Sequence, residues 1–206
     1  LIFQPALRVE NNCQNCGFSQ VRLNGLEGGY SQILIDGRPI FSALDGVYGL
    51  DQMPTAMIER IEVVRGGGSA LYGGNAIACT ITVITKETIS TGFEVSTNQA
   101  FIGGDDPDRN YSMNASFVSN DQLMGLSLFG VVRDRDPYDH DGDDFSEITT
   151  LQNQSFGARA FYRTGPLSKF TVEIHRLYED RRGGNRFEFA PHEADIAEAL
   201  THRVWG

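Results

Sequence analysis

The sequence predicts a mainly β protein, in which a small mixed α+β domain precedes antiparallel strands long enough to cross a membrane. Short strands separated by glycine turns fill residues 32–86, and longer segments with alternating apolar and polar residues follow residue 87. The chain has 206 residues with 23 glycines and 40% hydrophobic residues, a composition typical of β-rich proteins with many turns. We therefore expect two domains, at residues 1–87 and 88–206.

The first half of residues 32–86 predicts a strand, a tight turn and a short helix. The apolar run 32–36 ends at Asp36-Gly37, a dipeptide that tolerates the left-handed backbone of tight turns. Pro54 suits the first turn of a helix, because its missing N–H would have had no partner there.

The second half predicts two strands around a glycine loop. A β-branched strand at residues 61–64 ends at Arg65, and three successive glycines, 66–68, then interrupt regular structure. One helical turn at residues 69–72 and a final strand at 80–85 follow. Glycine loops before helices can also bind phosphate, but this one lacks the lysine and hydroxyl of a nucleotide-binding loop.

This order of elements is highly distinctive, most of all in MPTAMIERIEVVRGGGSALYGGNAIACTITVITK. It resembles the plug domain of TonB-dependent outer-membrane receptors. The resemblance implies a plug inside a wide β-barrel in the bacterial cell outer membrane, which the periplasmic TonB protein pulls to import a scarce large nutrient. Siderophores, haem and cobalamin are the substrate classes it implies, without enzymatic chemistry.

Two other functions compete with transport. A surface receptor or adhesin would share the barrel but only bind or signal, and a soluble β-sandwich binding module would show similar alternation. The net charge of −10 argues against nucleic acid as a partner, since phosphate binding relies on clustered Lys and Arg. There is no run of about 18 apolar residues and no leader, and we expect a piece of a longer receptor whose TonB-contacting segment and remaining wall lie elsewhere.

Beyond residue 87, alternation predicts five or six strands with one apolar and one polar face, expected near 93–102, 110–119, 123–134, 150–163 and 169–179. Such strands suit a barrel wall between lipid and a wet lumen. The apolar face is expected to carry Tyr111, Met113, Ala115, Phe117, Met124, Leu126, Leu128, Val132, Phe156, Ala158, Ala160, Tyr162, Phe170, Val172 and Ile174.

The connections are expected to alternate in length. Residues 103–109, 135–149 and the polar stretch after 180 are longer, whereas 120–122 and 164–168 are tight. Short periplasmic turns and long extracellular loops are typical of outer-membrane barrels.

Three cysteines are present, two of them in the motif Cys13-Gln14-Asn15-Cys16. We interpret the pair as a local disulfide of an oxidising compartment. A thioredoxin-like site would need a βαβ context, and a zinc ribbon would need a second pair of cysteines. Cys79 would then remain unpaired and buried.

Several plug residues are candidates for function by the resemblance. Arginines of this segment pair with barrel carboxylates in the family, which implies a plug–barrel lock at Arg60 and Arg65. The alternative is that both arginines are solvated residues at the two ends of a strand. Tyr30, Arg38 and Tyr48 lie in plug loops that could face the substrate.

The loop 135–149 is a candidate calcium site. Asp139, Asp141 and Asp143 alternate around Gly142, and hard oxygen ligands converge in this way on a calcium ion. Glu147 or Asp136 would complete the site, since Thr150 stands where a closing glutamate is usual. The alternative is a solvated acidic loop.

Overall fold

A computed structural model describes residues 7–11, 19–23, 26, 31–39, 57–66, 68–72, 76–77, 79–166 and 168–205. These residues form two compact units, with the boundary between Glu87 and Thr88. The helix expected at Pro54 and the Cys13–Cys16 disulfide lie outside the described residues and stay predictions.

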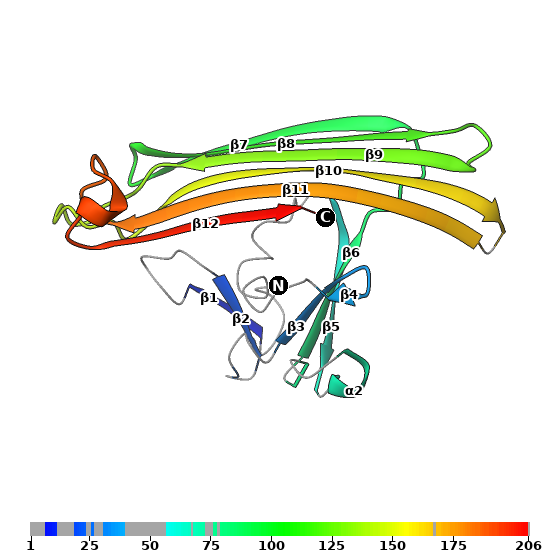
Figure 1. Cartoon of the computed structure of the whole chain (residues 1–206), viewed down its shortest axis with the longest axis horizontal. Coiled ribbons are helices and arrows are strands. Elements are labelled where there is room, and N and C mark those ends of the chain that lie inside the picture. The colour runs from blue at the N-terminus through cyan, green and yellow to red at the C-terminus, as the bar shows by residue number, and fades with distance from the viewer. Residues whose placement is uncertain are drawn as a thin grey trace. The chain divides into compact units, whose positions relative to one another are not determined.

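The first unit contains two small sheets and one helical turn (Figure 1). Strands β1 (Leu7–Asn11) and β2 (Ser19–Leu23) form an antiparallel pair. The second sheet has the order β4 (Arg38–Pro39), β3 (Ser31–Ile35), β6 (Cys79–Thr85), β5 (Ile58–Arg65), and only β3 and β6 are parallel. Helix α2 (Ser69–Tyr72) lies between β5 and β6 in the chain, as predicted.

Strand β6 forms the centre of this unit. Ile81 and Val83 are almost completely buried, together with Ile33 and Leu34 of β3, which suits a strand covered on both faces. Cys79 is free and buried, as predicted, and its Sγ lies 3.2 Å from Ser31 Oγ.

The Asp36-Gly37 turn is confirmed. Asp36 and Gly37 have φ of 48° and 78°, the left-handed conformation that this dipeptide favours. The Asp36 carboxylate also accepts hydrogen bonds from Thr85 N at 2.9 Å and Thr85 Oγ1 at 2.6 Å. One side chain therefore joins the turn to the end of β6.

The glycine loop is used for packing. A side chain at Gly68 would place Cβ 2.8 Å from Thr80 Oγ1, so only glycine fits. Gly68 N donates to Ala76 O at 2.8 Å, which removes it from any phosphate cradle.

The second unit is a six-stranded antiparallel sheet in simple sequence order, and Figure 1 shows its strands as long and curved. Its strands are β7 (Gly92–Ile102), β8 (Asp106–Val118), β9 (Met124–Arg135), β10 (Thr150–Gly165), β11 (Ser168–Gly184) and β12 (Ala197–Trp205). A 3-10 helix, η3 (Pro191–Glu193), lies between the last two. No helix among the described residues is long and apolar enough to cross a membrane.

The expected long connection at 103–109 is wrong. Strand β8 begins at Asp106, and Pro107 pairs with Phe101, so only residues 103–105 connect β7 to β8. Proline is tolerated at the start of a strand, where a missing N–H costs little. The connections 136–149 and 185–196 are long, as expected.

Two glycines on the polar face of the sheet are covered by aromatic rings. Gly125 pairs with Phe161, and Gly157 pairs with Phe129. A Cβ at Gly125 would lie 2.2 Å from the Phe161 ring, and one at Gly157 would lie 2.1 Å from the Phe129 ring. Both phenylalanines are buried as a result.

Candidate functional site

The sheet has one apolar face that is widely exposed. Strand register brings Phe93, Ala115, Leu128, Ala158 and Ile174 into one row across five strands. Phe93 is 85% exposed and Ile174 is 61% exposed. Exposed apolar area of this extent marks an interaction surface, and its alternation fits a barrel wall that faces lipid.

Aromatic residues border this apolar face at both ends. Tyr162 and Phe170 pair near the β10–β11 turn. Tyr111 of β8 and Tyr178 of β11 share a row that lies closer to the long connections. Aromatic girdles at the two membrane interfaces are typical of transmembrane barrels.

The opposite face carries ion pairs. Arg133 binds Asp108 through two hydrogen bonds of 2.9 and 2.7 Å, and Arg159 lies 2.9 Å from its cross-strand partner Glu173. Such charges suit a polar lumen.

A buried charged cluster lies on the same polar face. Glu179 is 1% exposed and accepts from Arg181 Nε at 2.7 Å and from Asn153 Nδ2 at 2.8 Å. Both carboxylate oxygens are therefore satisfied, as burial of a charge requires.

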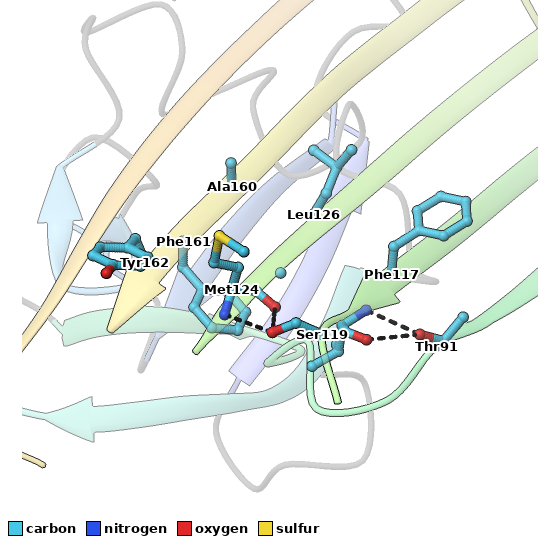
Figure 2. A pocket seen from close by; sticks show the side chains of 10 residues that line it. Thr91, Phe117, Ser119, Met124, Leu126, Ala160, Phe161 and Tyr162 are labelled. Atoms are coloured by element: carbon cyan, nitrogen blue, oxygen red, sulfur yellow. Dashed lines mark hydrogen bonds between the residues drawn. The ribbon is translucent and has the colours of Figure 1, made fainter. Parts of the chain in front are cut away.

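An open recess of about 500 Å³ lies where β8, β9 and β10 approach the short turns (Figure 2). Phe117, Met124 and Leu126 contribute apolar lining from β8 and β9. Side-chain hydroxyls satisfy two backbone N–H groups in this recess: Thr91 Oγ1 accepts from Val118 N at 2.9 Å, and Ser119 Oγ accepts from Met124 N at 3.0 Å. No residue that lines the recess carries a charge at neutral pH.

The candidate lock residues both lie on β5. Arg60 is exposed and contacts Glu59 and Glu62 of its own strand, each at 2.8 Å. The hydrogen bond to Glu62 is the main cause that raises the pKa of Arg60 above its ordinary value. Arg65 is exposed at the strand end.

Among the candidate substrate-facing residues, Arg38 is exposed directly after the Asp36-Gly37 turn. Tyr30 and Tyr48 lie outside the described residues. Their facing toward a substrate stays a prediction.

The acidic loop brings the predicted calcium ligands together. One oxygen each from Asp139, Asp141, Asp143 and Glu147 lies within 4.8 Å of the others, so Glu147 rather than Asp136 joins the group. Asp139 accepts from Gly142 N at 2.7 Å and Asp144 N at 2.8 Å. The Gly142 N–H is the main cause that lowers the pKa of Asp139.

Arg182 was not anticipated from the sequence. Its guanidinium donates to four backbone carbonyls of the 185–196 connection, with Phe189 O at 2.5 Å and Arg186 O at 2.9 Å the nearest. The dipeptide Arg181-Arg182 before two glycines was the available signal. Only the structure shows that one arginine turns to Glu179 and the other to the loop.

The first part of the chain is similar to a known protein family. A family model described as the TonB-dependent receptor plug domain matches residues 2–80. Residues 2–80 are therefore similar to the plug domain of TonB-dependent receptors. The predicted likeness to this family and the predicted mainly β fold are confirmed.

Two curated relatives are vitamin B12 transporters of Vibrio vulnificus. The chain is 33% identical to that of strain CMCP6 over 120 residues, which is 58% of this chain and 19% of the relative. For strain YJ016 the identity is 30%, over 57% of this chain and 20% of the relative. The chain thus spans about a fifth of the length of these relatives.

Among solved structures, the fold is similar to a mutant of the ferric enterobactin receptor of Pseudomonas aeruginosa. The TM-score is 0.67 at 19% identity, over 87% of this chain and 29% of that one. This likeness shows the shared fold.

Proposed function

We propose that the receptor containing this chain imports a scarce large nutrient across the outer membrane, driven by TonB. The observation that carries the proposal is the plug domain followed directly by strands with one lipid-type and one polar face. A surface receptor or adhesin would need the same wall but no movable plug. TonB, lipid and the imported ligand are the partners of this proposal.

Cobalamin is the first substrate to test within the siderophore, haem and cobalamin classes. Two relatives at 30% identity or above are vitamin B12 transporters, whereas the similar siderophore receptors named by solved structures fall at or below 20% identity and support only the fold.

Uptake measurements test both the TonB-driven transport and the choice of cobalamin as the substrate. The full-length receptor is expressed in an outer-membrane mutant that lacks its own cobalamin and siderophore receptors, with and without TonB. Accumulation of labelled cobalamin only when TonB is present supports the proposal. Uptake of a ferric siderophore or haem instead keeps transport and changes the substrate, and surface binding without uptake favours the adhesin.

We also propose that Arg60 and Arg65 help hold the plug, through carboxylates of the barrel. Arg60→Ala and Arg65→Ala would then raise passive entry of a large antibiotic into cells. Lys86→Ala, at an exposed site of the same domain, is the matched control. Equal antibiotic sensitivity of all three variants and the parent would contradict the lock.

A second proposal is calcium binding by the 136–149 connection, supported by the convergence of Asp139, Asp141, Asp143 and Glu147. Carboxylate oxygens are the ligands that calcium prefers. Calorimetry on the full-length receptor should show calcium binding that Asp141→Ala plus Asp143→Ala abolishes. Asp144→Asn, outside the four-residue group, should leave it unchanged, and identical traces for all variants would leave a solvated acidic loop.

A further inference from the structure

Three connections lie at one end of the six-stranded sheet: residues 103–105, 136–149 and 185–196. They follow one another along the left-hand end of the sheet in Figure 1, because each joins a successive pair of antiparallel strands. Each connection contacts the next one in this row or the strand end from which the next one starts. We call the three segments together the three-loop ridge.

The first contact joins residues 103–105 to residues 136–149. The Tyr138 ring lies over Gly103, since a Cβ at Gly103 would lie 2.2 Å from Tyr138 Cε2. Tyr138 is held by the backbone of its own connection, because its N–H donates to Ile148 O at 3.0 Å. Only glycine leaves room for the ring, and the φ of 62° at Gly103 also favours glycine.

The second contact joins residues 136–149 to the end of β11 and the start of the next connection. Ser146 N donates to Gly184 O at 2.9 Å, and Gly184 N donates back to Ser146 Oγ at 3.3 Å. Phe145 and Asn185 form an isolated β-bridge beside this exchange. Ser146 is 1% exposed, so water cannot readily replace these bonds when they break.

An arginine fixes the base of each long connection. Arg135, the last residue of β9, donates to Thr149 O and to Thr149 Oγ1, both at 2.9 Å, and so joins the two ends of 136–149. Arg182 donates to four backbone carbonyls of 185–196. None of these contacts uses a carboxylate of the candidate calcium site. The bonds that hold the ridge therefore need neither calcium nor a bound ligand.

We propose that the three-loop ridge is one preformed unit at the mouth of the barrel, ordered before any substrate or calcium binds. Neighbours that share buried hydrogen bonds open together, because loosening one leaves donors and acceptors of the other without partners. The inference rests on the proposed transport function, in which long connections face the outside and meet the substrate first. A preformed ridge selects substrate by its fixed shape and loses less conformational entropy on binding than loops that order only around the substrate.

Hydrogen exchange of the full-length receptor in detergent micelles tests the proposal, in calcium-free buffer and without substrate. One test variant is Gly103→Ala, which displaces Tyr138 at one end of the ridge. Gly104→Ala is its matched control, because Gly104 is also left-handed, with a φ of 106°, but a Cβ there would meet nothing within 4 Å.

A second test variant disturbs the ridge from its other end. Arg182→Gln weakens the bonds to the carbonyls of 185–196. Arg186→Gln is its control, since the Arg186 side chain has an exposed ion pair with Asp195 at 3.1 Å, and such pairs contribute little to stability.

In the parent, the hydrogen-bonded amides of Tyr138, Ser146, Asn185 and Ile196 should be protected relative to their intrinsic exchange rates. Gly103→Ala should lower this protection by at least about tenfold in 136–149 and in 185–196 alike, as overpacking at a tight contact loosens the whole unit. Arg182→Gln should have the same effect in the reverse direction. Each control should match the parent in the connection remote from its substitution.

Two results would overturn the proposal. Loss of protection confined to the connection next to the substitution would show that the loops open independently. Exchange of the parent amides at their intrinsic rates, with protection only after calcium is added, would show that the ridge is not preformed.

Protection of the β9 and β10 amides checks folding, and a variant that loses it is replaced by Tyr138→Ala or Arg182→Lys. Absence of TonB-dependent uptake would count against the proposed transport alone, because no substrate is present during exchange.

Discussion

At the residue scale, reciprocal glycine–phenylalanine pairs determine how closely β9 and β10 pack on their polar face. Alternation in the sequence placed Phe129 on the polar side without a reason for an apolar ring there. The structure supplies the reason, because each ring occupies the space that a Cβ would take on the neighbouring strand. Such a cross-strand relation depends on register, which one strand's sequence does not contain.

We predict that Gly125→Ala and Gly157→Ala destabilise the receptor by about 1–3 kcal/mol each, as overpacking does in tight sites. The buried rings of Phe161 and Phe129 would have to move from Cβ positions 2.2 and 2.1 Å away. Urea unfolding of the full-length receptor in lipid vesicles measures the change. Gly92→Ala, where a Cβ meets nothing within 4 Å, is the control, and equal stability of all three variants would show that the rings adapt freely.

The Asp139 carboxylate gives a residue-level prediction with a pH dependence. Its pKa is lowered below the ordinary 3.8 by backbone N–H groups, so the charged form stabilises the turn. That contribution is present above about pH 3.8 and disappears as the pH falls through the lowered value.

The protection of amides 136–149 against hydrogen exchange, measured in calcium-free buffer relative to the intrinsic rate at each pH, should therefore fall only at strongly acidic pH. Asp139→Asn should produce fast exchange already at neutral pH, because it weakens the bonds to Gly142 N and Asp144 N. Asp144→Asn is the control. Unchanged exchange in Asp139→Asn would mean that another contact orders the loop.

At the scale of elements, alternation predicted the strands and their faces, while turn composition failed at one connection. Asp and Pro near residue 107 looked like a loop, yet Pro107 lies in β8 opposite Phe101. The Asp-rich connection 136–149 was anticipated, but its backbone hydrogen bond to the end of β11, Ser146 N to Gly184 O at 2.9 Å, was not. Hydrogen bonds between segments that are distant in the sequence leave no local pattern.

The lipid-facing assignment makes a strong prediction for two strands. Leu126→Arg and Val172→Arg place a charge on the exposed apolar face of β9 and β11. Each should destabilise the full-length receptor by roughly 2–4 kcal/mol if it lies near the membrane midplane, because lipid cannot solvate the guanidinium. The amount of folded receptor in outer-membrane fractions measures assembly.

Thr171→Arg, on the polar face beside Val172, is the matched control and should assemble normally. Ser127→Arg should also be better tolerated than Leu126→Arg, although Ser127 is a less neutral site because its hydroxyl contacts Thr88. Equal assembly of Val172→Arg and Thr171→Arg would show that the faces are assigned wrongly.

At the scale of the whole molecule, the plug was predictable because its order of strands, turn and glycine loop is local in the sequence. A partner for Arg60 on another element was not predictable, since the carboxylates that Arg60 contacts, Glu59 and Glu62, come from its own strand. Six strands with one exposed apolar face also leave edge strands, β7 and β12, in the described sheet. Unpaired edges and exposed apolar faces both favour association with other chains.

We therefore predict that these 206 residues, expressed alone, do not form a stable soluble monomer. The edge N–H and C=O groups of β7 and β12 would pair between copies, and the face that exposes Phe93, Val95 and Phe170 would associate in water. Size-exclusion chromatography and thermal melting should show aggregates without a cooperative transition, and detergent should reduce association by covering the apolar face. A monodisperse protein that melts cooperatively without detergent would contradict a lipid-facing wall, because the same surface would then have to be stable in water.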